Sequence, residues 1–257
     1  MNKKLVFITG AAGGIGFEIA RQFAMEGARV AISDSDTAKL ERAESILRDQ
    51  HLNVRGVELD VTNEQEIAAV LDETCKAYGR IDVLVNNAGL QYVSPIEEFP
   101  TDKFRLLIDV MLIAPFITTK YVFPVMKKQK SGRILNIASI NGLIGFPGKA
   151  AYNSAKHGLI GLTKVTALEG AEYNITANAL CPGYVATDLV QNQLEALAKT
   201  RGIPVDKVLD EVIFPFVPQK RLLTADEIAN YALFLCSEKA AGITGQAVVI
   251  DGGYTIQ

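Results

Sequence analysis

The chain has 257 residues, of which 49% are hydrophobic, and a formal net charge of -3. This length suits one or two domains, and no linker or charge run divides the sequence, so we predict one domain over residues 1–257. Dispersed Lys and Arg argue against a nucleic-acid partner, and two distant histidines argue against a metal site.

Short apolar segments alternate with longer segments of helical periodicity. The predicted strands are residues 4–9, 29–33, 54–59, 82–86, 133–139, 175–181 and 247–251. These strands are apolar along their length, which is typical of a parallel sheet covered on both faces. We therefore predict an α/β fold: a doubly wound, Rossmann-like domain with a parallel seven-stranded sheet and helices on both faces. Ligands of such a fold bind beyond the carboxyl ends of the strands.

One segment interrupts the alternation. Residues 188–222 contain two predicted amphipathic helices around Gly202 and Pro204, with no strand between them. A long insertion after the carboxyl end of a strand is where such an enzyme places a helical substrate lid. A surface excursion without a role is the alternative.

The cysteines and the N-terminus bear on location. Cys75, Cys181 and Cys236 stand apart in apolar surroundings, which predicts buried free thiols and fits a reducing cytoplasm. The first apolar run, LVFI, is too short for a signal peptide, and we find no later apolar span of 18 residues. We expect a cytoplasmic protein with a small soluble partner and no membrane partner.

A glycine-rich turn, TGAAGGIG, follows the first predicted strand and leads into a helix. Glycine allows positive φ and close backbone approach, and the free N–H groups of a helix N-terminus attract pyrophosphate. The residues predicted to bind a dinucleotide here are Gly10, Gly13, Gly14, Ile15 and Gly16.

The second predicted strand ends at Asp34, 18 residues after Gly16. A carboxylate there accepts hydrogen bonds from the adenosine ribose and repels a 2′-phosphate. Neither Ala11, Ala12 nor Ser35 supplies a cation that could bind such a phosphate. The sequence therefore predicts NAD rather than NADP as the cofactor.

Three further residues suit proton transfer. Tyr152 and Lys156 lie on one face of a helix predicted to start near Ala150. A tyrosine has an ordinary pKa of about 10, and lowering it to about 7 needs about 4 kcal/mol, which a cation at about 4 Å can supply. Ser139 ends a predicted strand, so its hydroxyl can share the same substrate oxygen. We predict Ser139, Tyr152 and Lys156 as catalytic residues, and we expect His157 to face about 100° away from Lys156.

Several motifs occur in a fixed order. They are TGAAGGIG, LDV at 59–61, NNAG at 86–89, Ser139, YNSAK at 152–156, PGYVAT at 182–187 and DGG at 251–253. With these motifs the sequence resembles the short-chain dehydrogenase/reductase family over essentially its whole length. The resemblance implies a homotetramer. It also implies cofactor contacts from Asp60, Val61, Asn87, Ala88, Gly89, Tyr152, Lys156, Pro182, Gly183, Val185 and Thr187.

One position departs from the family. After NNAG the family usually has an asparagine that supports a helix distortion, whose main-chain carbonyl binds a water leading to the lysine; here that position is Met111. Methionine cannot donate the same hydrogen bonds. We interpret Met111 as a residue that weakens the proton exit, and an inactive relative is the alternative.

Within the family, residues 90–100, 164–185 and 189–204 and the terminal DGGYT resemble D-3-hydroxybutyrate dehydrogenases. Those enzymes hold the substrate carboxylate with two glutamines, a lysine and a histidine. The matched positions here are Gln91, Gln193, Lys149 and, in place of the histidine, Asn141. With Ser139 and Tyr184 these form the predicted substrate site.

The resemblance and the chemistry favour an NAD-dependent oxidoreductase that interconverts (R)-3-hydroxybutyrate and acetoacetate, with Tyr152 as general base and acid. Lys149 would hold the carboxylate of this hydroxy or oxo acid. Because Asn141 cannot carry a positive charge, another β-hydroxy acid, a neutral diol or a hydroxy-ketone stays an alternative. A non-catalytic nucleotide-binding sensor is a third hypothesis, which the Ser139, Tyr152 and Lys156 set disfavours.

Overall fold

The structure is a computed structural model that describes residues 1 and 3–256. Six side chains of the 188–222 segment lie outside this description, and they are Leu189, Asn192, Gln193, Ala196, Thr200 and Arg201.

The core of the fold is a parallel sheet. Its strands are β1 (Leu5–Thr9), β2 (Arg29–Asp34), β3 (Val54–Glu58), β4 (Val83–Asn86), β5 (Gly132–Ile137), β6 (Ile175–Pro182) and β7 (Ala247–Ile250). They form one seven-stranded sheet in the order β3-β2-β1-β4-β5-β6-β7, and every neighbouring pair is parallel. The predicted doubly wound α/β fold is confirmed.

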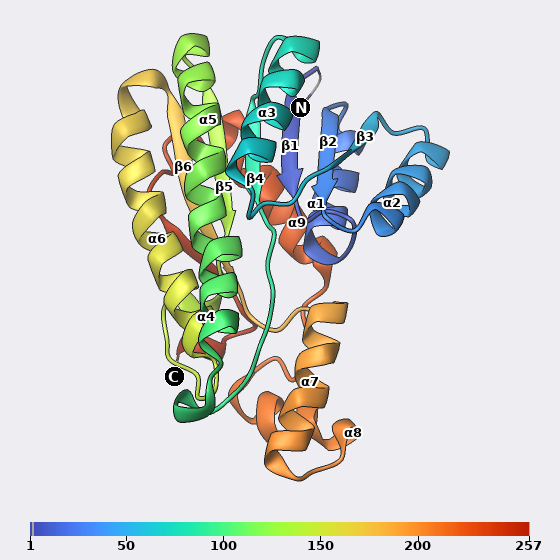
Figure 1. Ribbon diagram of the computed structural model, residues 1–257, viewed down its shortest axis with the longest axis vertical. Helices are drawn as coiled ribbons and strands as arrows, with labels where there is room; N and C mark the ends of the chain where they lie inside the picture. The colour runs from blue at the N-terminus through green and yellow to red at the C-terminus, as the bar shows by residue number, and fades with distance from the viewer. Residues whose placement is uncertain (2, 257) are drawn as a thin grey trace.

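Helices connect the strands and cover both faces of the sheet (Figure 1). The helices are α1 (Gly14–Met25), α2 (Thr37–Asp49), α3 (Glu64–Tyr78), α4 (Thr101–Ile108), α5 (Ala114–Gln129), α6 (Ala150–Gly170), α7 (Asp188–Arg201), α8 (Val205–Val208) and α9 (Ala225–Leu235). One apolar cluster packs α1, α2 and α9 on one face of the sheet, and another packs α3, α5 and α6 on the other face. The strands β1, β4, β5 and β6 are buried along their full length, which explains why their sequences do not alternate.

The 188–222 segment forms a helical insertion, as predicted. Helix α7 ends at Gly202, which adopts a φ of +66°, and α8 begins after Pro204 and continues into a π-helix, Leu209–Ile213. The insertion has its own apolar cluster, and the bridge between Val185 and Leu223 joins its two ends. In Figure 1, α7 and α8 lie beyond the carboxyl ends of the strands.

Our expectation that no long apolar span occurs was wrong in one place. The continuous helical run Thr101–Gln129 is long and apolar enough to span a membrane by length and composition alone. Half of its most apolar window is buried inside the protein, where α5 packs on the sheet and against α3. The core helix of a soluble protein can have the same length and composition, so this run is weak evidence for a membrane span.

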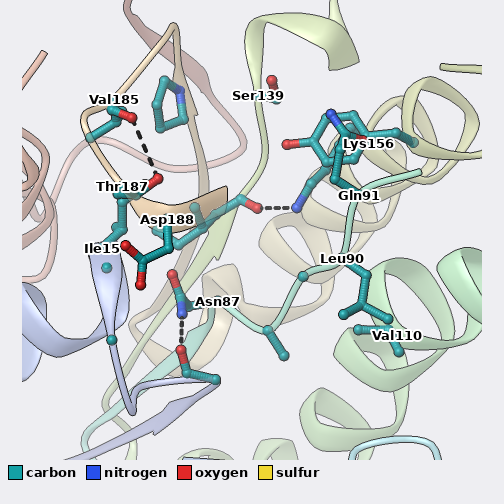
Figure 2. A pocket seen from close by; sticks show the side chains of 18 of the residues that line it. Ile15, Asn87, Leu90, Gln91, Val110, Ser139, Lys156, Val185, Thr187 and Asp188 are labelled. Carbon is teal, nitrogen blue, oxygen red and sulfur yellow. Dashed lines mark hydrogen bonds between the residues drawn. The ribbon is translucent and has the colours of Figure 1, made fainter. Parts of the chain in front are cut away.

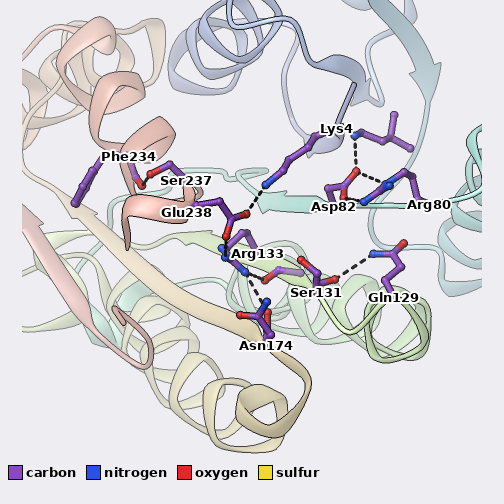
Figure 3. A network of polar contacts seen from close by, with 12 residues as sticks. Lys4, Arg80, Asp82, Gln129, Ser131, Arg133, Asn174, Phe234, Ser237 and Glu238 are labelled. Carbon is purple, nitrogen blue, oxygen red and sulfur yellow. Dashed lines mark hydrogen bonds and ion pairs between the residues drawn. The ribbon is translucent and has the colours of Figure 1, made fainter. Parts of the chain in front are cut away.

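The opposite end of the sheet carries an ion pair between a buried arginine and an exposed glutamate (Figure 3). The Arg133 side chain is only 2% exposed, and it donates to Glu238 Oε2 at 3.1 Å and to the carbonyls of Gly132 and Asn174 at 2.8 and 3.1 Å. Lys4 also pairs with Glu238, at 2.7 Å, on the protein surface. Arg133 therefore joins β5, the turn before β6 and the segment after α9.

We expect Arg133→Met to lower the free energy of unfolding by about 2–4 kcal/mol, because it removes the ion pair with Glu238 and the side-chain donor to the buried Gly132 carbonyl. The exposed pair between Lys4 and Glu238 contributes less to stability, so Lys4→Met should change the free energy of unfolding by less than about 1 kcal/mol. Urea unfolding measures both, read from the midpoint at unchanged slope. Equal small effects of the two variants would contradict a structural role for Arg133.

Candidate active site

A cavity of about 530 Å³ lies at the carboxyl ends of the strands. Of the residues predicted from the sequence, those that line it are Gly10, Gly13, Gly14, Ile15, Asp34, Asp60, Val61, Asn87, Ala88, Gly89, Gln91, Ser139, Asn141, Lys149, Tyr152, Lys156, Pro182, Gly183, Tyr184, Val185 and Thr187. In Figure 2, Ile15, Asn87 and Thr187 lie at one end of this cavity, and Ser139, Lys156 and Gln91 lie at the other. The fold thus brings together residues from all parts of the sequence.

Of the predicted residues, Gly16 does not line the cavity, and the side chain of Gln193 lies outside the described residues. Gly16 lies behind the turn, where a Cβ atom would stand 2.4 Å from Asn87 Nδ2 and 2.8 Å from the Gly10 carbonyl oxygen. Glycine at position 16 therefore allows close packing against Asn87 and the Gly10 carbonyl. Gln193 is on α7, but its side chain lies outside the described residues.

The glycine-rich turn is fixed to the end of β4. Gly10 has a φ of +61°, and a Cβ atom there would lie 2.6 Å from Ala88 Cα. The Asn87 amide donates to the carbonyls of Thr9 and Gly10 at 3.0 and 2.6 Å. By contrast, a Cβ atom at Gly13 would meet nothing within 4 Å, so open space faces the N-terminus of α1. This cradle fits the pyrophosphate of a dinucleotide.

The adenosine end of the cavity holds one residue that the sequence analysis missed. Asp34 accepts from the Ala12 backbone N–H at 3.3 Å, as a ribose-binding carboxylate on this turn would. Lys39, in the first turn of α2, also lines the cavity and pairs with Asp36 at 3.0 Å. Its position five residues after Asp34, at the start of a predicted helix, is the signal that could have revealed it. A cation is therefore present near the adenosine site.

The predicted catalytic residues meet at the other end. Lys156 is 4% exposed and its Nζ donates to the Ile137 carbonyl at 2.6 Å, while it stands 5.6 Å from the centroid of the Tyr152 ring. Helix α6 begins at Ala150, as the spacing predicted. Ser139, Tyr152 and Lys156 all line the cavity, so hydroxyl, phenol and ammonium face one region.

The electrostatics of Tyr152 differ from our expectation. Burial raises the pKa of Tyr152, and the hydrogen bond from Ser139 opposes this rise. Burial also lowers the pKa of Lys156 to about 8. The Lys156 ammonium is directed to the Ile137 carbonyl, and the chain by itself does not lower the phenol pKa. A bound oxidised nicotinamide would add its positive charge to that of Lys156.

A helix distortion is present around Met111, the position where the resemblance implied an asparagine. Residues Asp109–Ile113 form a π-helix between α4 and α5. Met111 is fully buried and packs with Leu107, Ala151 and Ala155. A π-helix changes the pattern of main-chain hydrogen bonds, and here apolar side chains pack around it.

The most unusual group of the site is Lys149. Its side chain is 2% exposed, and among the residues that the structure describes its ammonium has no acidic partner and no hydrogen bond. It lies 4.5 Å from the Phe146 ring centroid and 5.7 Å from those of Tyr152 and Tyr184. Burial lowers the pKa of Lys149 to about 7. Such a cation at the wall of a cavity is suited to bind an anion.

Asn141 lines the same cavity as Lys149 and is 4% exposed. Its backbone N–H donates to Ser139 Oγ at 3.1 Å, which joins the predicted substrate residue to the catalytic serine. The cavity also has lining residues that we did not predict, chiefly the apolar Leu90, Leu106 and Val110, and the acidic Asp188 at the start of α7.

His157 and the three cysteines differ in burial. His157 is exposed, as expected, with Nδ1 at 2.9 Å from the Asn153 carbonyl oxygen. Cys181 and Cys236 are buried free thiols, whereas Cys75 is only half-buried. Among the described residues, no three His, Cys, Asp or Glu side chains group to hold a metal ion.

The chain is similar to known oxidoreductases. A family model described as enoyl-(acyl carrier protein) reductase matches residues 10–255. An uncharacterized oxidoreductase of Bacillus subtilis, YxjF, is 63% identical over the full length of both chains, and the D-beta-hydroxybutyrate dehydrogenase of Cupriavidus necator is 40% identical, also over both full lengths. Among solved structures, actinorhodin polyketide ketoreductase with NADPH has a TM-score of 0.95 and 33% identity, covering 99% of each chain.

The lowered pKa of Lys149 predicts a pH-dependent anion affinity. The ammonium is present below pH about 7 and is lost as the pH rises, while acetate stays charged throughout. We expect the Kd of acetate to rise by about tenfold per pH unit above 7. Isothermal titration of the protein between pH 6 and 9 measures this, and Lys149→Met should bind weakly at every pH. A constant Kd in the wild type would contradict the role of Lys149.

Proposed function

The chain belongs to the short-chain dehydrogenase/reductase family of oxidoreductases, and we propose that it is an NAD-dependent dehydrogenase that interconverts (R)-3-hydroxybutyrate and acetoacetate. The observation that carries this proposal is the buried Lys149 ammonium, which has no acidic partner among the described residues and lies on the same cavity wall as Tyr152. Two of the curated relatives that match the full chain are D-beta-hydroxybutyrate dehydrogenases.

In the proposed reaction, the chain's own residues orient the substrate and move its proton. The Ser139 hydroxyl and the Tyr152 phenol bind the carbinol oxygen, and Tyr152 accepts the hydroxyl proton as general base. Lys156 stabilises the resulting phenolate electrostatically. The nicotinamide supplies the hydride acceptor when it is bound. In the reverse direction Tyr152 returns the proton to the carbonyl oxygen.

Charge supports an acid as the substrate. A buried ammonium without a counter-ion is unfavourable, and a carboxylate that enters the cavity compensates it. In a 3-hydroxy acid the carboxylate is two carbons from the carbinol, so both ends of a short molecule can reach Lys149 and Tyr152. Gln91 and Asn141 line the same cavity and offer amide donors to the carboxylate. We propose that Gln193, on α7, joins them, and that residues 188–222 act as a lid.

A neutral diol, hydroxy-ketone or another β-hydroxy acid is the second candidate substrate. The observation that favours it is Asn141, which is uncharged where the compared dehydrogenases are expected to have a histidine. A screen of NADH absorbance with (R)- and (S)-3-hydroxybutyrate and neutral alcohols separates the candidates. Turnover of neutral alcohols alone would refute the acid substrate, and NADH binding without turnover would favour a sensor.

The cofactor preference rests on Asp34. Its carboxylate lines the adenosine end and would repel a 2′-phosphate, which supports NAD. Lys39 lines the same end and is a cation, but Asp36 neutralises it. A similar ketoreductase structure holds NADPH, so this preference needs its own test.

We also propose that the protein is a cytoplasmic homotetramer. Exposed apolar side chains on the outer faces of α5 and α6 support an interface between copies: Phe116 is 50% exposed, Val165 53% and Leu168 78%. On the last strand Val249 is 37% exposed. Such side chains on adjoining helices are typical of an oligomer surface.

We expect Lys149→Ala to raise the KM for 3-hydroxybutyrate by about 10- to 100-fold, because a charge-assisted hydrogen bond is lost. The KM for a neutral secondary alcohol should change by less than about twofold, since no carboxylate is present. Steady-state kinetics at pH 6.5 measures both. Lys39→Ala, a lysine variant at the other end of the cavity, is the control. Equal effects of Lys149→Ala on both substrates would contradict the proposal.

The double variant Asp34→Ser, Ser35→Arg should shift the preference from NAD toward NADP by about 100-fold or more. It removes the repulsion of a 2′-phosphate and adds a cation that can bind one. Fluorescence titration of NADH and NADPH gives both Kd values without a substrate. Unchanged discrimination would show that Asp34 does not contact the ribose.

A further inference from the structure

Four buried polar side chains lie just beneath the candidate active site. They are Thr118 on α5, Asn86 on β4, Asn136 on β5 and Thr163 on α6, and none is more than 3% exposed. Asn86 and Asn136 are register partners at the carboxyl ends of their strands. We call this set the polar ladder. Its position matters because the residues that follow the two asparagines enter the cavity.

The hydrogen bonds of the polar ladder all run in one direction. Thr118 Oγ1 donates to Asn86 Oδ1 at 2.6 Å, and Asn86 Nδ2 donates to Asn136 Oδ1 at 2.8 Å. Asn136 Nδ2 then donates to Thr163 Oγ1 at 2.8 Å, and Thr163 Oγ1 donates to the Leu159 carbonyl at 2.7 Å. Hydrogen bonds in such a chain polarise one another, and in a dry core the loss of one leaves a buried polar group unpaired.

The ladder ends on the helix that carries the catalytic pair. Thr163 is seven residues after Lys156, so both side chains lie on the face of α6 that meets β5. Lys156 Nζ bonds to the Ile137 carbonyl, and Thr163 bonds to the adjacent Asn136. Two neighbouring residues of β5 therefore hold α6 at two successive levels. Ser139 lies two residues after Ile137 on the same chain segment.

The other end of the ladder reaches the π-helix. Thr118 lies in the first turns of α5, directly after the π-helix that contains Met111. The ladder thus ties α5 and α6 through β4 and β5, whereas apolar side chains pack around Met111 in the helix distortion. Apolar contacts alone allow a helix to slide, because they have little directional preference.

We propose that Thr163 and Asn136 are positioning residues, whose hydrogen bond fixes α6 along and about its axis so that Tyr152 and Lys156 face the reacting atoms. This positioning role explains why two asparagines, Asn86 and Asn136, occur opposite each other in an otherwise apolar part of the sheet. The proposal rests on the proposed dehydrogenase function for its kinetic test, but not for its spectroscopic one.

Thr163→Val is the test variant, because it keeps the shape of the side chain and removes the hydroxyl that accepts from Asn136. Since small misplacements of catalytic groups cost up to about 100-fold, we expect kcat to fall by about tenfold or more, while KM changes by less than about twofold. Thr163→Ser keeps the hydroxyl and should restore kcat. Thr163→Ala gives the same comparison where Thr163→Val does not fold.

Thr166→Val is the matched control. Thr166 lies on the same helix, is 6% exposed and donates only within the helix, to the Leu162 carbonyl at 2.9 Å. Its variant loses one helix hydroxyl bond without any bond to the sheet, so Tm should fall and kcat should stay the same. If Thr163→Val also lowers Tm without lowering kcat, the proposal is overturned and the polar ladder is only a structural feature.

A second measurement needs no substrate. The titration of Tyr152, read at 295 nm as the difference from the matching Tyr152→Phe protein, reports its surroundings, where Lys149, Lys156 and Cys181 are the titratable neighbours described. Displacement of α6 should change the burial that raises the Tyr152 pKa, and so shift this pKa by about half a unit or more in Thr163→Val, but not in Thr166→Val. If this shift occurs in a protein that is inactive on hydroxybutyrate, the positioning role of the polar ladder is supported and the proposed substrate is rejected. If neither the pKa nor kcat changes, the positioning role of the polar ladder is rejected.

Discussion

The parallel alignment of the strands is the constraint on which the site depends. Because β1, β2, β4, β5 and β6 all end at one edge, the residues that follow them share one cavity. Gly10, Asp34, Asn87 and Ser139 thus meet although long helices separate them in sequence. The close contacts at this edge are specific: the Asn87 amide bonds to the glycine-rich turn, so the end of one strand shapes the phosphate cradle after another.

Burial of positive charge is the second organising feature. The site encloses Lys149 and Lys156, and for both residues burial lowers the pKa. Lys156 has a carbonyl partner, whereas Lys149 faces three aromatic rings and the cavity. An uncompensated buried cation destabilises a fold, so its presence at a cavity wall is typical of a binding site. This is the physical reason for favouring an acid over a neutral alcohol as the substrate.

The region around Met111 shows how two kinds of interaction share one task. Apolar packing retains the π-helix, and the polar ladder nearby links the same helix to the catalytic helix through two strands. Packing gives stability with little directional preference, while buried hydrogen bonds hold only in one geometry. A methionine at this position is therefore compatible with an ordered site.

The sequence by itself determined the features that depend on local spacing. Continuous apolar strands indicated a parallel sheet, the glycine-rich turn indicated the phosphate site, and the four-residue spacing placed Tyr152 and Lys156 on one helix face. Tertiary structure alone decided the raised pKa of Tyr152, the lack of an acidic partner for Lys149 among the described residues, the position of Lys39 at the adenosine end and the polar ladder. These depend on burial and on contacts between segments far apart in the chain, and neither is encoded in the spacing of residues along a single element.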